Sequence, residues 1–165
     1  GLSSGTNYGI QSSVIYISIY LIMNLALFSC LFMLRSQNKY YENIEDLSGI
    51  SKNHPVLSLC FLIVLFSLAG IPPLAGFFAK FYIFMSVIKQ SMYFLAVVGL
   101  LSTVISAFYY LRIIKIIYFD PEKIIFDKDH NLGLKLTLAL SSFFLLLYFI
   151  YPSILIELIS KINII

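Results

Sequence analysis

Four apolar stretches separated by polar segments dominate the pattern along the chain. Three of them contain no charged residue and are 21 to 24 residues long: 11–34, 90–111 and 136–156. About 20 apolar residues in an α-helix cross the roughly 30 Å hydrocarbon core of a bilayer. None of the three shows the alternation of apolar and polar residues that is typical of strands in a membrane barrel. The pattern therefore predicts three membrane-spanning helices.

The fourth apolar stretch, 56–88, is too long for one straight span. A continuous helix of 33 residues would measure about 50 Å. Its middle reads GIPPLAG, in which two prolines remove backbone donors and the flanking glycines permit unusual dihedral angles. We expect a discontinuous helix with a break at about 70–77, and a re-entrant hairpin of two short helices is the alternative. The residues expected to form the break are Gly70, Pro72, Pro73 and Gly76.

Composition supports a membrane protein. Of the 165 residues, 60% are hydrophobic and only 12% are charged, whereas soluble domains carry about 25% charged residues. The net charge of +3 is too small to indicate a nucleic-acid partner. The predicted fold is an all-α integral membrane domain over 1–165 with four transmembrane segments. Backbone groups freed at a break need protein or water around them, so we expect the chain to lie in a larger assembly.

The distribution of basic residues predicts the orientation. Eight of the 11 lysines and arginines lie in the two segments 35–55 and 112–135, and the opposite side carries only Lys89 and Lys161. Basic loops remain on the cytoplasmic or matrix side of a membrane. Both long loops are therefore expected there, with both termini on the periplasmic or intermembrane-space side.

Lys80 is the strongest chemical signal in the sequence, because it is the single charge in 56–88. A lysine inside a span costs about 2.5–3.5 kcal/mol on insertion scales, and such groups are usually functional. Desolvation and a nearby carboxylate could make Lys80 a proton relay. The alternative is that its long side chain reaches the membrane surface. All eight acidic residues lie in loops or at a helix end, so a carboxylate partner would come from another polypeptide.

Arg112 and Lys115 lie three residues apart, on one face at the cytoplasmic end of the span 90–111. Anchoring by basic residues is the simpler explanation, and the mouth of a proton relay is the alternative. The two cysteines, Cys30 and Cys60, lie in apolar runs and are expected to act as small hydrophobic residues. No motif for a metal or a cofactor is present in the sequence.

The run FSLAGIPPLAGFFAKFYIF (66–84) resembles the signature of the antiporter-like subunits of respiratory complex I, and is most similar to subunit 2, called N in bacteria. IEDLSGISKNHP (44–55) and SAFYYLRIIKIIYFD (106–120) resemble the flanking loop and helix of that family. The resemblance implies inverted repeats of five helices, each with one broken helix. It identifies Lys80 with the family lysine on the second broken helix. It also implies that the chain corresponds to the C-terminal part, without the first repeat, as a fragment or as one product of a split gene.

The function implied by the resemblance is that of a proton-translocating membrane-arm subunit of NADH:ubiquinone oxidoreductase. The chain would then be part of an enzyme without holding a redox centre, since NADH, FMN, iron–sulfur clusters and ubiquinone belong to the rest of the complex. Its partners would be other membrane-arm subunits, a chain carrying the N-terminal half, and lipid. The location would be the mitochondrial inner membrane or, alternatively, the bacterial inner membrane. Two other functions remain open: a subunit of a multisubunit cation/proton antiporter or membrane hydrogenase, or a structural subunit in which Lys80 is dispensable.

Overall fold

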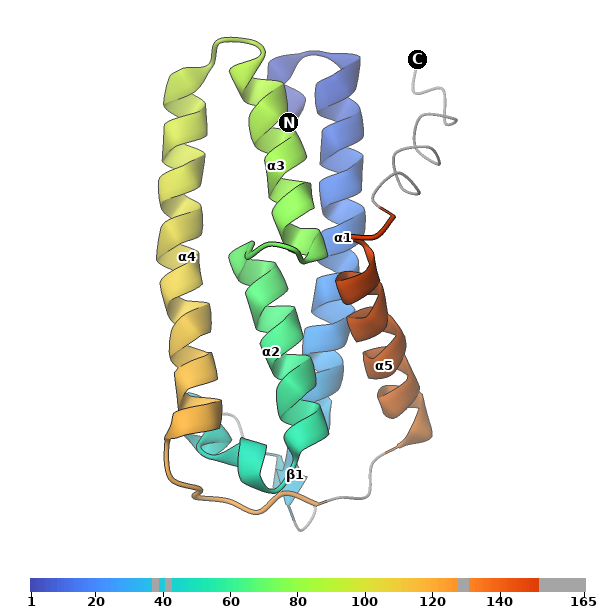
Figure 1. The fold of residues 1–165 in the computed structure, drawn as a ribbon, viewed down its shortest axis with the longest axis vertical. Helices are drawn as coiled ribbons and strands as arrows, with labels where there is room; N and C mark the ends of the chain where they lie inside the picture. Colours follow the sequence, from blue (N-terminus) through green and yellow to red (C-terminus); the bar gives the residue numbers. More distant parts are fainter. Residues whose placement is uncertain (37–38, 41–42, 128–130, 152–165) are drawn as a thin grey trace.

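The computed structural model describes residues 1–36, 39–40, 43–127 and 131–151. Within this part of the chain, five α-helices form an elongated bundle (Figure 1). They are α1 (Asn7–Phe32), α2 (Pro55–Ala69), α3 (Ala75–Ile88), α4 (Tyr93–Phe119) and α5 (Leu132–Leu147). The short elements are the 3₁₀ helices η1 (Leu2–Ser4), η2 (Ile44–Leu47) and η3 (Ile50–Lys52), and the antiparallel pair β1 (Arg35–Ser36) and β2 (Lys39–Tyr40).

Helices α2 and α3 lie one above the other in the middle of the bundle, and together they cover about the same height as α1 (Figure 1). The chain leaves helical geometry after Ala69 and resumes it at Ala75. The interruption is thus 70–74, shorter than the expected 70–77. The reason is that Leu74, with an extended backbone, serves as the N-cap of α3, so the residues that follow it are already helical. The Pro72–Pro73 peptide bond is cis.

The first helix begins earlier than the expected 11–34. Thr6 has an extended backbone, and its hydroxyl accepts a hydrogen bond from the Gly9 amide at 3.1 Å. A threonine in this position satisfies one of the free amides of the first turn. The helix therefore starts at Asn7, before the apolar run itself, and ends at Phe32.

Helix α4 continues to Phe119, well past the expected end of the span 90–111. Lysine and arginine do not stop a helix, because their intrinsic helix propensity is as high as that of other residues with long side chains. The stop comes from Pro121, which disfavours helical geometry in the residue before it, and Asp120 is extended with ψ 155°. The apolar pattern located the span, and the proline set its end.

Helix α5 also differs from its expected range, 136–156. The side chain of Asn131 accepts a hydrogen bond from the Gly133 amide at 2.9 Å, which caps the helix and starts it at Leu132. The helix ends at Leu147. The part of the expected span after residue 151 lies outside the described residues.

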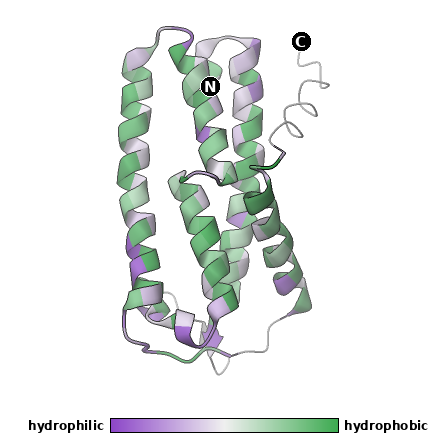
Figure 2. Cartoon of the chain, viewed as in Figure 1, coloured by the Kyte–Doolittle hydropathy of each residue, from purple (hydrophilic) through white to green (hydrophobic). Residues whose placement is uncertain are grey.

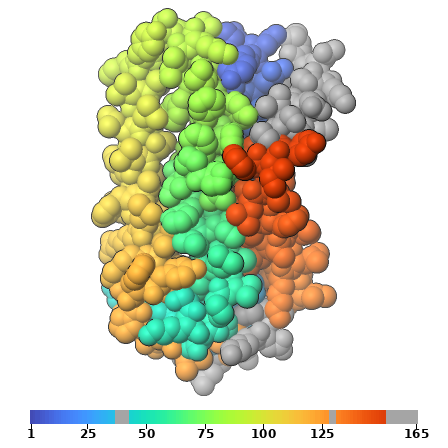
Figure 3. Space-filling view, in the orientation of Figure 1, coloured from blue at the N-terminus to red at the C-terminus, as the bar shows by residue number. Residues whose placement is uncertain are grey.

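Two helices of the described chain are long and apolar enough to cross a membrane, α1 and α4. Their surroundings differ: one third of the most apolar window of α1 is buried inside the bundle, compared with 6% of that of α4. Helix α1 packs against α3 and α5, whereas α4 packs mainly against α2. The space-filling view shows α4 and α5 at opposite edges with α2 and α3 between them (Figure 3).

The described parts of the two long loops lie together at one end of the bundle, which we call the loop end: residues 33–36, 39–40, 43–54 and 120–127. The Gly49 amide donates to the Ile116 carbonyl at 3.1 Å, and the Asp127 amide donates to the Arg35 carbonyl at 2.9 Å. The hydrophilic residues visible in Figure 2 gather mainly at this end, while the helices are largely hydrophobic along their length. The two loops therefore share one end of the bundle.

Candidate functional site: the junction between α2 and α3

The C-terminus of α2 leaves four carbonyl oxygens that need partners from outside the helix. Gly70 has φ 86° and ψ 35°, a left-handed conformation that favours glycine. In this geometry the Gly70 and Ile71 amides both donate to the Phe66 carbonyl at 3.0 Å, and the Gly70 amide also contacts the Ser67 carbonyl at 3.0 Å. Two of the four carbonyls are satisfied by the turn itself.

Lys80 of α3 supplies the partners for the other two carbonyls. Its Nζ donates to the Leu68 oxygen at 2.8 Å and to the Ala69 oxygen at 3.1 Å. A cation at a helix C-terminus is stabilised by the partial negative charge of the unpaired carbonyls. A Cβ on Gly70 would lie 3.0 Å from Cδ and 3.3 Å from Nζ of Lys80. The missing side chain of Gly70 thus leaves the space that Lys80 occupies.

The N-terminus of α3 is capped in the opposite direction, by a residue of α2. The N-cap residue Leu74 has no side chain that could bond to the free amides. The Ser67 hydroxyl oxygen accepts the hydrogen bond of the Gly76 amide at 3.0 Å instead. The same hydroxyl donates to the sulfur of Met23 on α1 at 3.2 Å. We call these two sets of bonds, Ser67 to Gly76 and Lys80 to Leu68 and Ala69, the reciprocal caps.

Close approach of the two helices makes the reciprocal caps possible. A Cβ on Gly76 would lie 1.8 Å from the backbone oxygen of Ser67. No side chain fits at that distance, so glycine is required there. Of the four residues expected to form the break, Gly70 and Gly76 lie directly in the junction, whereas Pro72 and Pro73 are exposed in the turn between the helices.

The charge of Lys80 is not balanced by an acid in the described part of the chain. Two ion pairs among these residues, Lys115–Asp120 and Lys123–Glu45, lie near the loop end, and neither involves Lys80. The junction lies at about mid-height of the bundle (Figure 1), and the half-buried Lys80 bonds to backbone carbonyls there. This ammonium is therefore held by neutral groups.

Arg112 and Lys115 lie in the C-terminal part of α4, which reaches the loop end. Both are exposed, and Lys115 pairs with Asp120. Arg112 lines a polar cleft of about 500 Å³ together with Glu45 and Lys123. Among the described contacts, neither residue bonds to the junction that holds Lys80.

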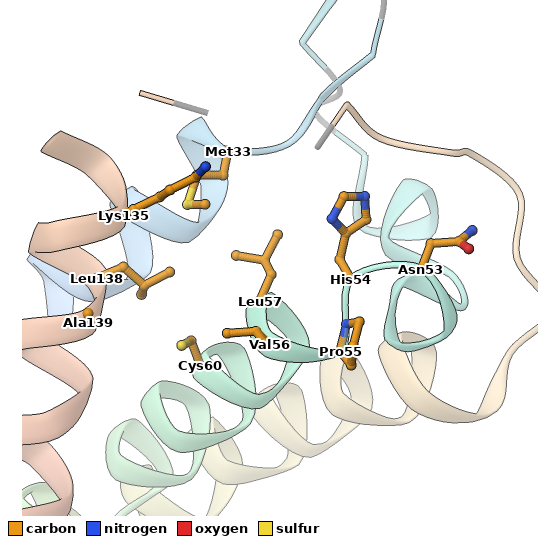
Figure 4. Close-up of a pocket in the computed structure, with 10 residues that line it drawn as sticks. All are labelled: Met33, Asn53, His54, Pro55, Val56, Leu57, Cys60, Lys135, Leu138 and Ala139. Carbon is orange, nitrogen blue, oxygen red and sulfur yellow. The ribbon is translucent and has the colours of Figure 1, made fainter. Parts of the chain in front are cut away.

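An apolar cavity near the loop end does not belong to this site. It has a volume of about 480 Å³ and lies between the end of α1, the start of α2 and the first turns of α5 (Figure 4). Its basic lining residues are Lys135 and His54, and the His54 ring bonds to the Phe126 carbonyl at 3.0 Å. The cavity is at the N-terminal end of α2, whereas Lys80 binds the C-terminal end of that helix.

Sequence reasoning singled out Lys80 but missed Ser67 and the two carbonyls. Ser67 is a single small polar residue within an apolar helix, and such residues commonly bond to their own helix. The carbonyls of Leu68 and Ala69 carry no side-chain signature at all. A usable signal was the coincidence of a helix stop at Gly70 with a lysine ten residues later, which brings free carbonyls and a cation to one place.

An apolar helical bundle in which a lysine ammonium is held at the junction of two short helices is typical of helical membrane proteins. Comparison with known proteins defines the family: the model described as "NADH:quinone oxidoreductase/Mrp antiporter, TM" matches residues 1–106. The chain belongs to this family.

Similar proteins and a similar solved structure support this family assignment. The chain is 70% identical, over its whole length, to NADH-quinone oxidoreductase subunit N of Pelagibacter ubique, and covers 35% of that protein, in its C-terminal part. It is 46% identical over 93% of its length to subunit N of Methylobacterium nodulans, of which it covers 32%. The fold matches a chain of respiratory complex I from Thermus thermophilus with bound aureothin (TM-score 0.77, 26% identity), covering 89% of this chain and 34% of that one. The chain thus spans about a third of the length of these relatives.

Proposed function

We propose that this chain forms the C-terminal part of a proton-translocating membrane-arm subunit of NADH:quinone oxidoreductase, with Lys80 as a proton carrier. The observation that carries the proposal is the bonding of Lys80 to the Leu68 and Ala69 carbonyls without a carboxylate among the described residues. A cation held by neutral groups has a protonation state that depends strongly on charges brought near it. That dependence is what a coupled proton carrier needs.

The two carbonyls suit both protonation states of Lys80. An ammonium has three N–H donors, and two of them are used by Leu68 and Ala69. A neutral amine still has two N–H donors, enough to keep both bonds, and its lone pair takes the place of the third. The third position can therefore give up a proton to water or to a carboxylate of another polypeptide, and take one back, while the nitrogen stays in place.

We further propose that α2 and α3 together make one membrane crossing with a break. At about 1.5 Å per residue, the 15 residues of α2 and the 14 of α3 are about 22 and 21 Å long. Neither would cross roughly 30 Å of hydrocarbon alone, but stacked end to end they would. With α1, α4 and the segment that begins with α5, this gives four transmembrane segments, within the inverted-repeat fold of the family.

The setting of the proposed subunit is the rest of the complex. Its partners are other membrane-arm subunits, the N-terminal portion present in the longer relatives, and lipid, with no nucleic acid. NADH, flavin, iron–sulfur clusters and quinone are assigned to the rest of the complex and not to this chain. The relatives named above are bacterial, which supports a bacterial inner membrane over a mitochondrial one. The loop end, with its basic residues, would face the cytoplasm.

For Arg112 and Lys115, the contacts favour anchoring at the membrane surface over a role as the mouth of the proton path. Both side chains are exposed at the end of α4, and Lys115 already pairs with Asp120. Basic residues at the cytoplasmic end of a span fix its orientation without any part in catalysis.

The family also includes Mrp-type cation/proton antiporters, which is the second candidate function. The identity of 70% to an oxidoreductase subunit favours complex I. A structural subunit is the third candidate, and it differs from the other two in one respect: Lys80 would be dispensable.

The test is substitution of Lys80 in the assembled respiratory complex, reconstituted in proteoliposomes, with NADH oxidation and the pH gradient followed together. We expect Lys80→Ala to depress both, because pumping and electron transfer are coupled. Lys80→Arg should also impair pumping while the complex assembles, since a guanidinium holds its proton at all working pH values.

Lys89→Ala is the matched control. Lys89 is exposed at the end of α3, and its ammonium lies 4.1 Å from the centre of the Tyr8 ring. Its loss should leave pumping unchanged. Normal pumping by an assembled complex carrying Lys80→Ala would remove Lys80 from the mechanism and favour the structural subunit.

A further inference from the structure

Ser67 is a fully buried polar side chain, with 0% of its surface exposed, in the last turn of α2. Its hydroxyl joins two other helices, accepting from Gly76 on α3 and donating to Met23 on α1. Other buried serines behave differently. The hydroxyls of Ser12 and Ser29 donate to carbonyls four residues back in their own helix, which is the ordinary arrangement for serine within a helix.

The position of Gly76 is coupled to that of Lys80. The two residues are four apart in α3, one turn of helix, and so lie on the same face. A bond that fixes the Gly76 amide therefore also fixes the turn from which the Lys80 side chain reaches back to α2. On α2, the two acceptors are also neighbours: Ser67 accepts the bond from the Gly76 amide, and the next residue, Leu68, accepts the bond from Lys80.

The Lys80 bonds leave little tolerance for movement. The Nζ–oxygen distances are 2.8 and 3.1 Å, and a hydrogen bond is effectively lost by about 3.6 Å. A displacement of the first turn of α3 by about 1 Å would therefore break one or both of them. A serine that caps that turn and is itself held by α1 limits such displacement.

We propose that Ser67 is a positioning residue for Lys80: by capping α3 at Gly76 and bonding to Met23, it fixes the place from which Lys80 binds the Leu68 and Ala69 carbonyls. The inference rests on the proposed function, since it gives Ser67 a role in proton transfer only through Lys80. It adds a third helix, α1, to the site and gives the reciprocal caps a joint role, because loosening the Ser67 cap weakens the Lys80 cap.

The experiment compares Ser67→Ala with Ser58→Ala in the assembled complex. Ser58 is an apt control because it lies on α2 as well, is also 0% exposed, and its hydroxyl has no hydrogen-bond partner in the described structure. We expect Ser67→Ala to lower kcat for coupled NADH oxidation about fivefold, or about 1 kcal/mol at 1.36 kcal/mol per tenfold, with the KM for quinone unchanged. Ser58→Ala should leave both unchanged.

The pH profile separates positioning from a general packing defect. An ammonium that has lost part of its carbonyl shell releases its proton more readily, so the alkaline limb of the pH–rate profile should move to lower pH in Ser67→Ala and remain in place in Ser58→Ala. A fall in rate with an unmoved profile, or an equal fall in both variants, would overturn the inference.

Two further variants cover the remaining outcomes. In a Lys80→Ala background, Ser67→Ala should cause no further loss of pumping, because the effects of residues that act through one another are not additive. An independent second loss of pumping would refute the positioning role.

If Ser67→Ala does not assemble, Met23→Leu is the deciding variant, since it removes only the sulfur acceptor at similar volume. It should shift the alkaline limb in the same direction, and an unchanged profile would contradict the inference. Full pumping by Lys80→Ala alone would instead sink the proposed function, whatever Ser67 does.

Discussion

Lysine is bound in two contrasting ways in this bundle. At the junction of α2 and α3, Lys80 is half-buried and bonds to two neutral backbone carbonyls. At the loop end, Lys115 and Lys123 are more than half exposed and pair with Asp120 and Glu45. An exposed pair is surrounded by water, so its charge is stable and its contribution to folding is small. The half-buried ammonium of Lys80 has no acidic partner among the described residues, so its proton is the one that neighbouring groups can influence.

The junction and the loop end also differ in whether their bonds satisfy backbone groups. The ion pairs of the loop end involve flexible side chains that can find other partners in water. The reciprocal caps satisfy backbone groups where two helices meet in an apolar bundle, and leaving such groups without a hydrogen bond is costly. We therefore expect substitutions at the junction to affect both stability and pumping, and substitutions at the loop end to affect neither by much.

Gly76→Ala should produce the largest effect. The new Cβ would lie 1.8 Å from the Ser67 backbone oxygen, which cannot move without unwinding the end of α2. The expected cost is on the order of 3 kcal/mol or more, and it should appear as a marked loss of assembled complex in membranes. In the control Gly133→Ala, the nearest atom is the Asn131 side-chain oxygen at 3.4 Å, so assembly should be normal. Equal yields of the two variants would contradict the close approach.

Gly70→Ala should have an intermediate effect with two parts. Gly70 and Gly5 both have a left-handed backbone, but a Cβ on Gly5 meets no atom within 4 Å, whereas one on Gly70 meets Lys80. The backbone strain, about 1–2 kcal/mol, should lower thermal stability in both variants. Pumping should fall only in Gly70→Ala, because only there is Lys80 displaced. If both variants pump normally, the place of Lys80 over Gly70 does not matter to transport.

Lys115→Gln should give the smallest effect. The Lys115 side chain is 63% exposed, and exposed ion pairs contribute about 0–1 kcal/mol. A double-mutant cycle with Asp120→Asn, measured by thermal unfolding of the complex at low and high salt, should give a coupling energy that fades as salt increases. Pumping should be unchanged. A clear loss of pumping would instead make Lys115 part of the proton path and remove the contrast between the two lysine sites.

Local sequence was sufficient for much of the fold. Apolar runs gave the approximate positions of α1 and α4, and the prolines and glycines between 70 and 76 located the interruption, because backbone preferences act over a few residues. The helix ends were less accurate. The true ends depend on single capping or stopping residues such as Thr6, Asn131 and Pro121, and hydrophobicity does not register them.

For the candidate site too, part could be predicted from the sequence and part could not. The sequence by itself determined that Lys80 is an isolated charge close to a helix interruption, because charge and chain order are visible without coordinates. Only the tertiary structure decided what holds it. The Leu68 and Ala69 carbonyls have no identity in the sequence, since every residue carries the same backbone oxygen. The bond from Gly76 to Ser67 exists because α2 and α3 meet closely enough for a serine of one helix to cap the other. Such a distance is set by packing across the whole bundle, including Met23 on α1, and not by any local preference of the residues that it joins.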